Sequence, residues 1–354
     1  MAIKKLSKPL RPSRLLVIAA ILVVGIAVVG CLACRRFLWN PVLNLPQGDK
    51  ATLYIPTGAT YDDVFLLLSA DGKLADPEAF GVMAQLMGYP SLVKSGKYEL
   101  TASLSARGLV RLLRSGQQVP VRVTFSGIRD VEHLAGVAAR NLEADSMSLL
   151  LAMRDTALMS EYGFTPQTAV AMYLPDSYDV WWNLSPDAWV KRMAYEYDKF
   201  WTDARKAKAD SIGLTPLQVS ILASIVQEES NIPEDQKIIA GLYLNRLRIG
   251  MPMQACPTVK FALGDFTIRR VTLANTQVDS PYNTYINPGL PPGPIRITSK
   301  SVIDAVLDNT PSDYLYMCAR PDGSGRHDFA RTLAQHQRNA AKYHSTLNKQ
   351  KIYR

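Results

Sequence analysis

Residues 215–230 read TPLQVSILASIVQEES, and this stretch determines how the second half of the chain begins to fold. Thr215 has the side chain of a helix N-cap, Pro216 suits the first helical position, and Gln218 stands where a capping box needs it. Farther along, Pro233 pushes the residue before it out of the helical region. The sequence therefore predicts a helix from Pro216 to about Ser230.

One acidic side chain lies on the apolar face of this predicted helix. At roughly 100° per residue, Glu229 projects near the centre of the apolar stripe, Glu228 falls at its edge and Gln227 points away. Burial of a carboxyl group raises its pKa, as a general acid near neutral pH requires. Alternatively, Glu229 ends the stripe as a hydrated carboxylate or pairs with Arg246 or Arg248. Spacing alone leaves both interpretations open.

The segments after this helix contain further candidates for a binding site. A second helix is predicted over Pro233–Arg248, and its Asn245 and Arg246 suit either hydrogen bonds to a sugar or helix capping. The loops Ser280–Tyr285 and Gly289–Pro294 are rich in Tyr, Asn, Thr and Pro. Rigid loops of this kind suit a groove for a hydroxylated substrate, and a purely structural role is the alternative.

The first half of the chain predicts a small α+β module followed by a mostly helical region over Ile128–Ala207. The aromatic residues between Tyr173 and Trp182 interrupt this region and are more typical of a core than of a surface that stacks on sugars. The predicted elements of the module are a strand at Ala51–Ile55, helices at Tyr61–Ala70 and Pro77–Met87, and strands at Lys97–Thr101 and Val119–Phe125.

Charge and composition exclude several classes of protein. The chain has 354 residues, of which 47% are hydrophobic and 20% charged, which excludes a disordered chain. Its net charge is +9, but seven basic and no acidic residues lie among the first 36, so the remainder carries only +2. We therefore expect no nucleic acid among the partners.

The amino-terminal segment predicts a membrane anchor. Leu15–Cys34 is an uncharged run of 20 residues, long enough to cross a hydrocarbon core of about 30 Å. Basic residues precede the run, so residues 1–14 are expected in the cytoplasm and the rest on the extracytoplasmic side of the inner membrane. The alternative is a lipoprotein signal, with Cys31 or Cys34 as the lipidated residue. A cleaved signal peptide is less favoured, since no A-x-A-like site is evident.

Two cysteines, Cys256 and Cys318, lie in the exported portion, where a disulfide is chemically permitted. Two buried free thiols are the favoured interpretation. The chain has no C-x-x-C or H-E-x-x-H motif, and its four histidines are scattered. We therefore expect neither a metal nor a cofactor.

Six motifs together resemble the endolytic murein transglycosylase family, also called the MltG or YceG-like family. They are ASIVQEES at 223–230, NRLRIGM at 245–251, PTV at 257–259, YNTY at 282–285, GLPPGP at 289–294 and YLY at 314–316. The resemblance is strong from residue 213 to 336 and weaker in a part similar to a LysM module, where residues 55–58 and the following helix carry it.

The resemblance implies an α+β fold class: a single transmembrane helix, a small LysM-like α+β module and a mixed α/β transglycosylase domain. The expected divisions are a cytoplasmic tail (1–14), a transmembrane anchor (15–34), a linker (40–50), the LysM-like module (51–126), a helical part of the transglycosylase region (127–212), the catalytic core (213–345) and a tail (346–354).

The family resemblance also implies an activity. It is endolytic, non-hydrolytic cleavage of the MurNAc-β-1,4-GlcNAc bond in peptidoglycan glycan strands, which leaves 1,6-anhydro-MurNAc ends and terminates strand elongation beside peptidoglycan synthases. The family's catalytic glutamate falls on Glu229. The expected substrate-binding residues are Gln254, Tyr282, Asn283 and Tyr285, supported by Asn245, Arg246 and Thr258.

Two other functions remain open from the sequence: a muramidase that hydrolyses the same bond with water, and a non-catalytic LysM-type wall-binding scaffold. A glycosidase that uses water needs two carboxyl groups, whereas a lytic transglycosylase can use one glutamate twice. The sequence also departs from the family pattern at three places. These are Cys256 in place of an aspartate, 297–299 (ITS) in place of Asn-Pro-Gly, and His336-Gln337 in place of His-Asn.

Overall fold

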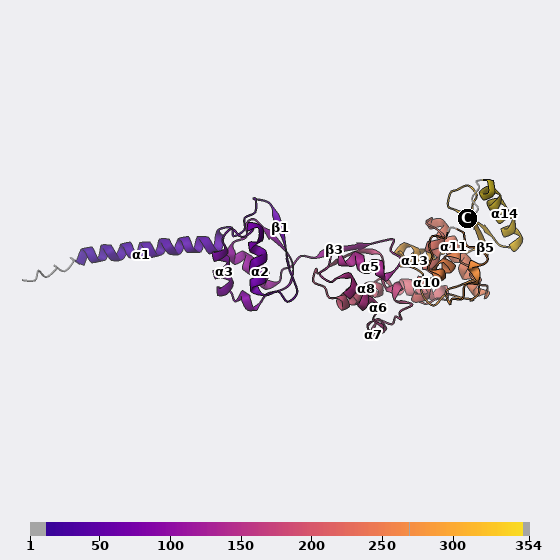
Figure 1. Cartoon of the computed structure of the whole chain (residues 1–354), viewed down its shortest axis with the longest axis horizontal. Helices are drawn as coiled ribbons and strands as arrows, with labels where there is room; N and C mark the ends of the chain where they lie inside the picture. Colours follow the sequence, from indigo (N-terminus) through magenta and orange to yellow (C-terminus); the bar gives the residue numbers. More distant parts are fainter. Residues whose placement is uncertain (1–11, 269, 350–354) are drawn as a thin grey trace, which may run out of the picture. The chain divides into compact units, whose positions relative to one another are not determined.

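A computed structural model describes residues 12–268 and 270–349. The chain divides into two compact units, coloured along the sequence in Figure 1. Residues up to Val121, together with Trp181–Asn183, form the first unit, and Arg122–Val180 with the chain from Leu184 onward form the second. Most of the expected cytoplasmic tail (1–14) and the last five residues of the expected carboxy-terminal tail lie outside the described residues.

The first unit begins with an apolar helix, α1 (Pro12–Cys34), which continues into a short π-helix, η1 (Arg35–Trp39). Leu16–Trp39 is long and apolar enough to cross a membrane. The position near the amino terminus also fits a signal sequence. Apolar side chains from Leu16 onward are exposed, as a helix destined for lipid requires.

The folded part of the first unit is a two-stranded sheet with three helices. Strand β1 (Lys50–Ile55) pairs antiparallel with β2 (Gly96–Thr101), and the order along the chain is β1, α2, α3, β2 and α4. The helices are α2 (Tyr61–Ser69), α3 (Pro77–Leu86) and α4 (Ala106–Ser115), joined by the 3₁₀ turns η2 (Ala70–Gly72) and η3 (Tyr89–Ser91). Helix α4 was not expected, although Ser105 caps its start and Gly116 ends it.

Residues 40–50, the expected linker, pack into this unit. Val42 and Leu43 belong to its hydrophobic core, and Leu43 forms a bridge with Leu74. Immediately before them, the Arg36 guanidinium donates to both carboxylate oxygens of Asp76, at 2.7 and 2.8 Å. The chain therefore enters the first unit directly from η1.

Near the start of the second unit, β3 (Val121–Phe125) pairs with β4 (Asp176–Val180). The sequence analysis expected β3 but not β4. Tyr173 and Tyr178 of the aromatic stretch are buried, whereas Trp181 is exposed. The mostly helical region contains α5 (Val131–Ala139), α6 (Ser146–Arg154), α7 (Thr156–Glu161), η4 (Ala169–Met172), α8 (Pro186–Phe200) and α9 (Asp203–Ser211).

Helix α10 (Pro216–Glu229) is central to the rest of this unit. Its capping box forms as predicted: Gln218 N–H donates to the Thr215 hydroxyl at 3.3 Å, and Thr215 N–H donates to the Gln218 amide oxygen at 2.9 Å. The helix packs against α11 (Pro233–Arg248), α12 (Cys256–Leu263) and α13 (Lys300–Leu307). Six consecutive residues of α10, from Ile221 to Val226, are buried.

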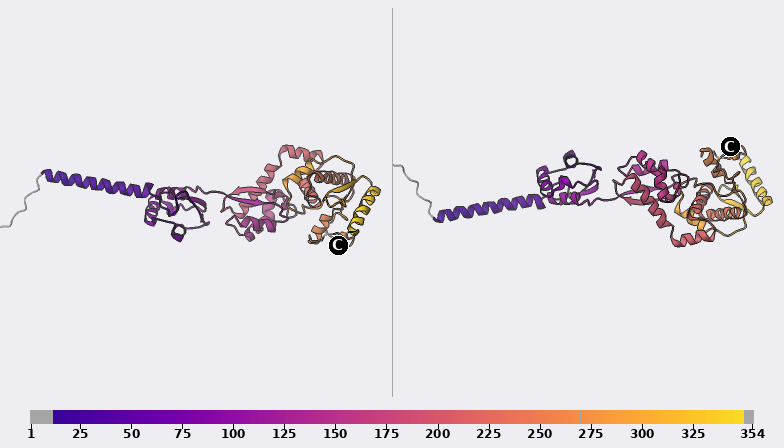
Figure 2. Two further views of the ribbon diagram at one scale, coloured as in Figure 1. Left: turned by 90° about the horizontal axis from the view of Figure 1, so that it is seen from above. Right: turned by 90° about the horizontal axis from the view of Figure 1, so that it is seen from below.

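A β-hairpin and a last helix complete the second unit. Strands β5 (Tyr316–Ala319) and β6 (His327–Ala330) pair antiparallel, and α14 (Leu333–Lys349, yellow in Figure 2) packs against them. A 3₁₀ turn, η5 (Asn275–Gln277), lies in the long loop before α13. Helix α14 runs through residues 346–349, the start of the expected tail.

Candidate active site

Glu229 is the last residue of α10, where the chain turns into the extended Ser230. Its carboxyl group is closely surrounded by protein atoms, although the residue as a whole is only half-buried. The Tyr243 hydroxyl, from the facing helix α11, donates to Glu229 Oε1 at 2.7 Å. The sequence analysis considered Arg246 and Arg248 as possible ion-pair partners of Glu229. Both donate their hydrogen bonds to other acceptors.

Burial raises the pKa of the Glu229 carboxyl above its ordinary value. The hydrogen bond from Tyr243 acts in the opposite direction, because it favours the ionised form of Glu229, and so do His327 and Lys260. Burial also raises the pKa of Tyr243 well above its ordinary value, which keeps its hydroxyl protonated as a donor. Burial thus favours the protonated form of Glu229, while the neighbouring groups stabilise its carboxylate.

Glu228, the adjacent carboxylate, has different surroundings. Arg129 Nη2 donates to both of its oxygens at 3.0 Å, and Arg296 Nη1 also donates to its Oε1. Both oxygens of Glu228 are therefore engaged by guanidinium groups. The neighbouring loop is fixed to the same helix, since Ser224 accepts from Ile295 N–H at 3.0 Å.

Histidine 327 is a site residue that the sequence analysis missed. Its backbone N–H donates to Asp235 Oδ2 at 2.7 Å, and its ring Nδ1 lies 3.1 Å from the same oxygen. Asp235 is 3% exposed. The pair joins residues 92 positions apart, which spacing cannot reveal. A signal for the buried carboxylate did exist, because Asp235 lies one turn before Ile239 on the apolar face of the predicted helix.

Two of the predicted supporting residues, Arg246 and Asn245, donate hydrogen bonds to backbone carbonyl groups. Arg246 donates to the carbonyls of Leu315 and Met253, each at 2.6 Å. The Asn245 amide donates to the carbonyl of Ser312 at 2.6 Å. Both side chains therefore fasten α11 to surrounding loops.

A strained turn precedes α12. Gln254 has a φ of +50°, which is uncommon for a residue other than glycine, and its backbone N–H donates to the Thr284 carbonyl at 3.0 Å. The Thr258 and Thr284 hydroxyls, 2.9 Å apart and buried, hold the two segments together. The Gln254 side chain remains exposed, so this turn presents it to solvent. Backbone strain of this kind concentrates at functional sites.

Asn283 and Tyr285 have separate roles in the YNTY loop. The Asn283 amide is fully buried and donates to the carbonyls of Thr276 and Val278 at 3.0 and 2.8 Å, while its oxygen accepts from Tyr285 N–H. Asn283 therefore shapes the loop. The Tyr285 hydroxyl lies 3.2 Å from Cys256 Sγ, and the charge of Glu229 acts on both groups.

Cys256 occupies the family's aspartate position, and burial raises the pKa of its thiol. Cys256 and Cys318 are separate, half-buried thiols in this structure.

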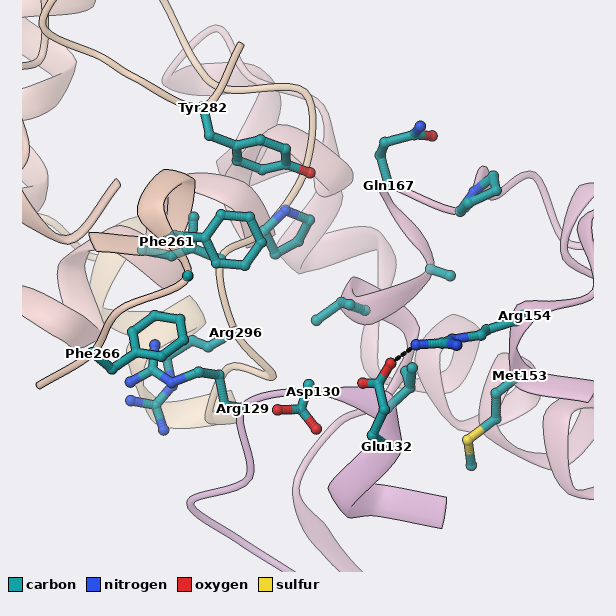
Figure 3. A pocket seen from close by; sticks show the side chains of 17 residues that line it. Arg129, Asp130, Glu132, Met153, Arg154, Gln167, Phe261, Phe266, Tyr282 and Arg296 are labelled. Carbon is teal, nitrogen blue, oxygen red and sulfur yellow. Dashed lines mark hydrogen bonds and ion pairs between the residues drawn. The ribbon is translucent and has the colours of Figure 1, made fainter. Parts of the chain in front are cut away.

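Tyr282 lines a cavity of about 600 Å³, whose lining does not include Glu229. Figure 3 shows the rings of Phe261 and Tyr282 on one side and the polar side chains of Glu132 and Arg154 on the other. The Phe261 and Tyr282 ring centroids are 4.6 Å apart. The structure thus separates the predicted residues: Tyr285 lies with Glu229, and Tyr282 lies in this cavity.

Comparison with known proteins gives consistent results. A profile of the YceG-like family matches residues 53–342. The endolytic murein transglycosylase of Streptococcus pneumoniae (strain D39) is 27% identical, with 88% of this chain and 62% of that protein covered. The endolytic murein transglycosylase of Bacillus subtilis is 26% identical, with 88% and 91% covered. The chain thus spans less than two thirds of the length of the pneumococcal relative.

A crystal structure of a YceG-like protein from Listeria monocytogenes has a similar fold. Its TM-score is 0.51 at 26% identity, and the alignment covers 82% of this chain and 98% of that chain. The chain belongs to the YceG-like family, since the family profile extends over most of its length. The fold is the expected mixture of helices and strands, which follows one amino-terminal apolar helix along the chain.

Proposed function

We propose that this chain is an endolytic peptidoglycan lytic transglycosylase that cleaves the MurNAc-β-1,4-GlcNAc bond and leaves 1,6-anhydro-MurNAc ends. The names of the pneumococcal and Bacillus relatives support this reaction. The observation that carries it is the enclosed carboxyl group of Glu229, with a raised pKa and Tyr243 donating to one oxygen. A carboxyl group in this state can serve as an acid near neutral pH.

In the proposed reaction, Glu229 acts twice. Protonated Glu229 gives its proton to the glycosidic oxygen as the bond from that oxygen to C1 of the muramic sugar breaks. The C6 hydroxyl oxygen of the same sugar then bonds to C1, and the Glu229 carboxylate takes the hydroxyl proton. The carboxyl group ends as it began, and no water is consumed. Tyr243, Lys260 and His327 stabilise the carboxylate between the two proton transfers.

The surroundings of Glu228 favour this reaction over hydrolysis by a muramidase. A glycosidase that uses water needs a second carboxyl group as base or nucleophile. Glu228 is the acidic residue whose charge acts on Glu229, and both of its oxygens already accept from Arg129 and Arg296. Of these two neighbouring carboxyl groups, Glu229 is the one without a guanidinium partner, and the transglycosylase reaction needs only one carboxyl group.

The residues around Glu229 fall into two proposed groups. Gln254, exposed on its strained turn, and Tyr285 contact the glycan strand. The buried residues Asn283 and Thr258 hold the loops that present them. Arg246 and Asn245 fix the end of α11 in the same way.

The remaining parts of the proposal concern location and partners. We place α1 in the inner membrane as a single-pass anchor, with the folded part of the first unit and the second unit on the extracytoplasmic side. The reason is that basic residues precede an apolar segment of sufficient length. The first unit acts as a LysM-like wall-binding module, which the helices between its two paired strands support. Cleavage close to the membrane terminates glycan strand elongation beside peptidoglycan synthases.

The test is product analysis with the full chain in detergent. We expect the wild type to release fragments with anhydro-muramoyl ends from purified glycan strands, as detected by mass spectrometry. Glu229→Gln should lower the rate by at least about a hundredfold, since it removes the group that transfers both protons. Glu196→Gln, an isosteric change of a paired glutamate on α8, is the matched control and should keep wild-type activity.

The products also separate the alternatives. Ends heavier by one water molecule would show hydrolysis and contradict the transglycosylase. Strand binding without cleavage by the wild type would favour the scaffold. Wild-type activity in Glu229→Gln would exclude this residue as the acid.

A further inference from the structure

The cavity beside the active site has two walls of different chemistry. Phe261 and Tyr282 form one wall, and Glu132, Arg154 and Gln167 form the opposite one (Figure 3). Glu132 and Arg154 form an ion pair with each other. The cavity volume of about 600 Å³ lies within the range of sites for small molecules, about 300–1,000 Å³.

The floor of the cavity is joined to the catalytic helix. Arg129 and Arg296 line the cavity, and both donate to Glu228, the residue before Glu229. The Arg129 guanidinium also lies over the Phe266 ring, 3.9 Å from its centroid. Arg129 Nη1 is buried and has no hydrogen-bond partner in the described part of the chain. Arg129 and Arg296 therefore connect the lining of the cavity to the end of α10.

The rim of the cavity depends on a close approach of two loops. A Cβ at Gly293 would lie 2.0 Å from the backbone oxygen of Gln167 and 3.1 Å from the Tyr282 hydroxyl. Glycine at this position of the GLPPGP motif therefore lets the 289–294 loop close against the segment that carries Gln167. The GLPPGP motif thus brings together two segments that line the cavity.

We propose that this cavity is a saccharide subsite, which binds an N-acetylated amino-sugar residue of the glycan strand adjacent to the bond that Glu229 cleaves. This inference rests on the proposed function. The C–H face of a sugar ring packs on the aromatic wall, since aromatic faces attract the positive edges of C–H groups. Hydroxyl and N-acetyl groups face Glu132, Arg154 and Gln167, whose carboxylate, guanidinium and amide groups can accept from or donate to them.

The test measures strand binding in the full chain carrying Glu229→Gln, which separates binding from turnover. The probes are glycan strands with and without their stem peptides, titrated by calorimetry. We expect Tyr282→Leu and Arg154→Ala each to weaken the Kd for both kinds of strand by about three- to tenfold, the loss of one or two net polar or stacking contacts. Arg122→Ala, which breaks an exposed Arg–Asp pair outside the cavity, is the matched control and should leave the Kd unchanged.

Several outcomes would overturn the proposal. Unchanged affinity in both cavity variants, with thermal unfolding like that of the parent, would show that the cavity is not a subsite. An effect confined to peptide-bearing strands would assign it to the stem peptide instead. These results are independent of the reaction itself. If the cavity variants weaken binding but the wild type forms no anhydro ends, only the proposed function is refuted. If the wild type forms anhydro ends but the cavity variants bind strands as tightly as their parent, only the subsite is refuted.

Discussion

Glu228 and Glu229 are neighbours in the chain but occupy different environments. Glu228 accepts from two guanidinium groups, whereas Glu229 faces the Tyr243 hydroxyl within a densely packed site. Because burial dominates at Glu229, its pKa is raised. Two adjacent carboxyl groups can thus be given separate roles, one structural and one chemical.

Tyr243→Phe tests this assignment through the pH dependence of kcat. The Tyr243 hydrogen bond favours the ionised form of Glu229, so its loss should raise the pKa of Glu229 further. Glu229 would then keep its proton to higher pH, and the alkaline limb of the plot of kcat against pH should shift to higher pH. We also expect kcat at the optimum to fall by about tenfold, because an orienting contact of about 1.4 kcal/mol is lost.

The control for this experiment is Tyr178→Phe. Tyr178 is a buried tyrosine of the same unit whose hydroxyl donates to the Leu174 carbonyl. Its replacement should leave the alkaline limb in place. An identical limb for wild type and Tyr243→Phe would mean that Glu229 is not the group that titrates there.

At the residue scale, the sequence singled out Glu229 as a candidate but did not predict its hydrogen-bond partner. Periodicity placed Glu229 on the apolar face of a well-capped helix, which depends only on local spacing. The contact of Tyr243 with Glu229 depends on how α10 and α11 pack, which spacing along one helix does not reveal. His327 comes from a distant hairpin. Asn283 was expected at the substrate, whereas its amide is used within its own loop.

At the scale of elements, two helical glycines differ in their surroundings. A Cβ at Gly241 on α11 would lie 2.5 Å from the Thr310 backbone oxygen. A Cβ at Gly136 on α5 would have nothing within 4 Å. The loop after α13 also donates Thr310 N–H to the Lys237 carbonyl at 3.1 Å, so it is fastened to α11 at this point.

The same substitution should therefore have opposite effects at these two positions. We expect Gly241→Ala to lower the free energy of unfolding by about 1–3 kcal/mol through overpacking. Gly136→Ala should raise it by about 0.5–1 kcal/mol through better helix propensity. Thermal or denaturant unfolding of the second unit measures both changes. Equal effects would show that α11 does not approach this loop so closely.

Elements with strong local signals were predicted well, and those set by long-range pairing were not. Helix α11 has the predicted bounds, and α10 ends within one residue of the prediction, because caps and prolines mark their ends. Strand β4 was missed, since its pairing with β3 brings together segments more than 50 residues apart. Helix α4 was missed although its Ser105 and Gly116 caps were legible in the sequence.

At the scale of the whole molecule, the proposed location depends on the apolar helix α1. An uncleaved anchor should keep the protein in the membrane fraction after an alkaline carbonate wash, with an intact mass equal to that of the full chain. Membrane association should be lost when residues 12–34 are deleted, because this segment supplies the apolar surface.

Intact mass also distinguishes the two other interpretations of this segment. A shortened, soluble product would indicate a signal peptide. A shortened product carrying a lipid mass would indicate a lipoprotein, and replacement of Cys31 and Cys34 by serine should then release it. Those two substitutions should have no effect on an uncleaved anchor.

The rigid entry into the first unit has a consequence for how the enzyme finds its substrate. A flexible stretch of about ten residues would let its ends move apart by roughly 17 Å. Here Arg36 is bound to Asp76, and Val42 and Leu43 lie in the core, so that freedom is absent. With α1 in the bilayer, as proposed, the folded part of the first unit would sample a thin layer at the membrane surface. The effective concentration of this unit would then be highest for strands in that layer and would fall sharply for strands farther out.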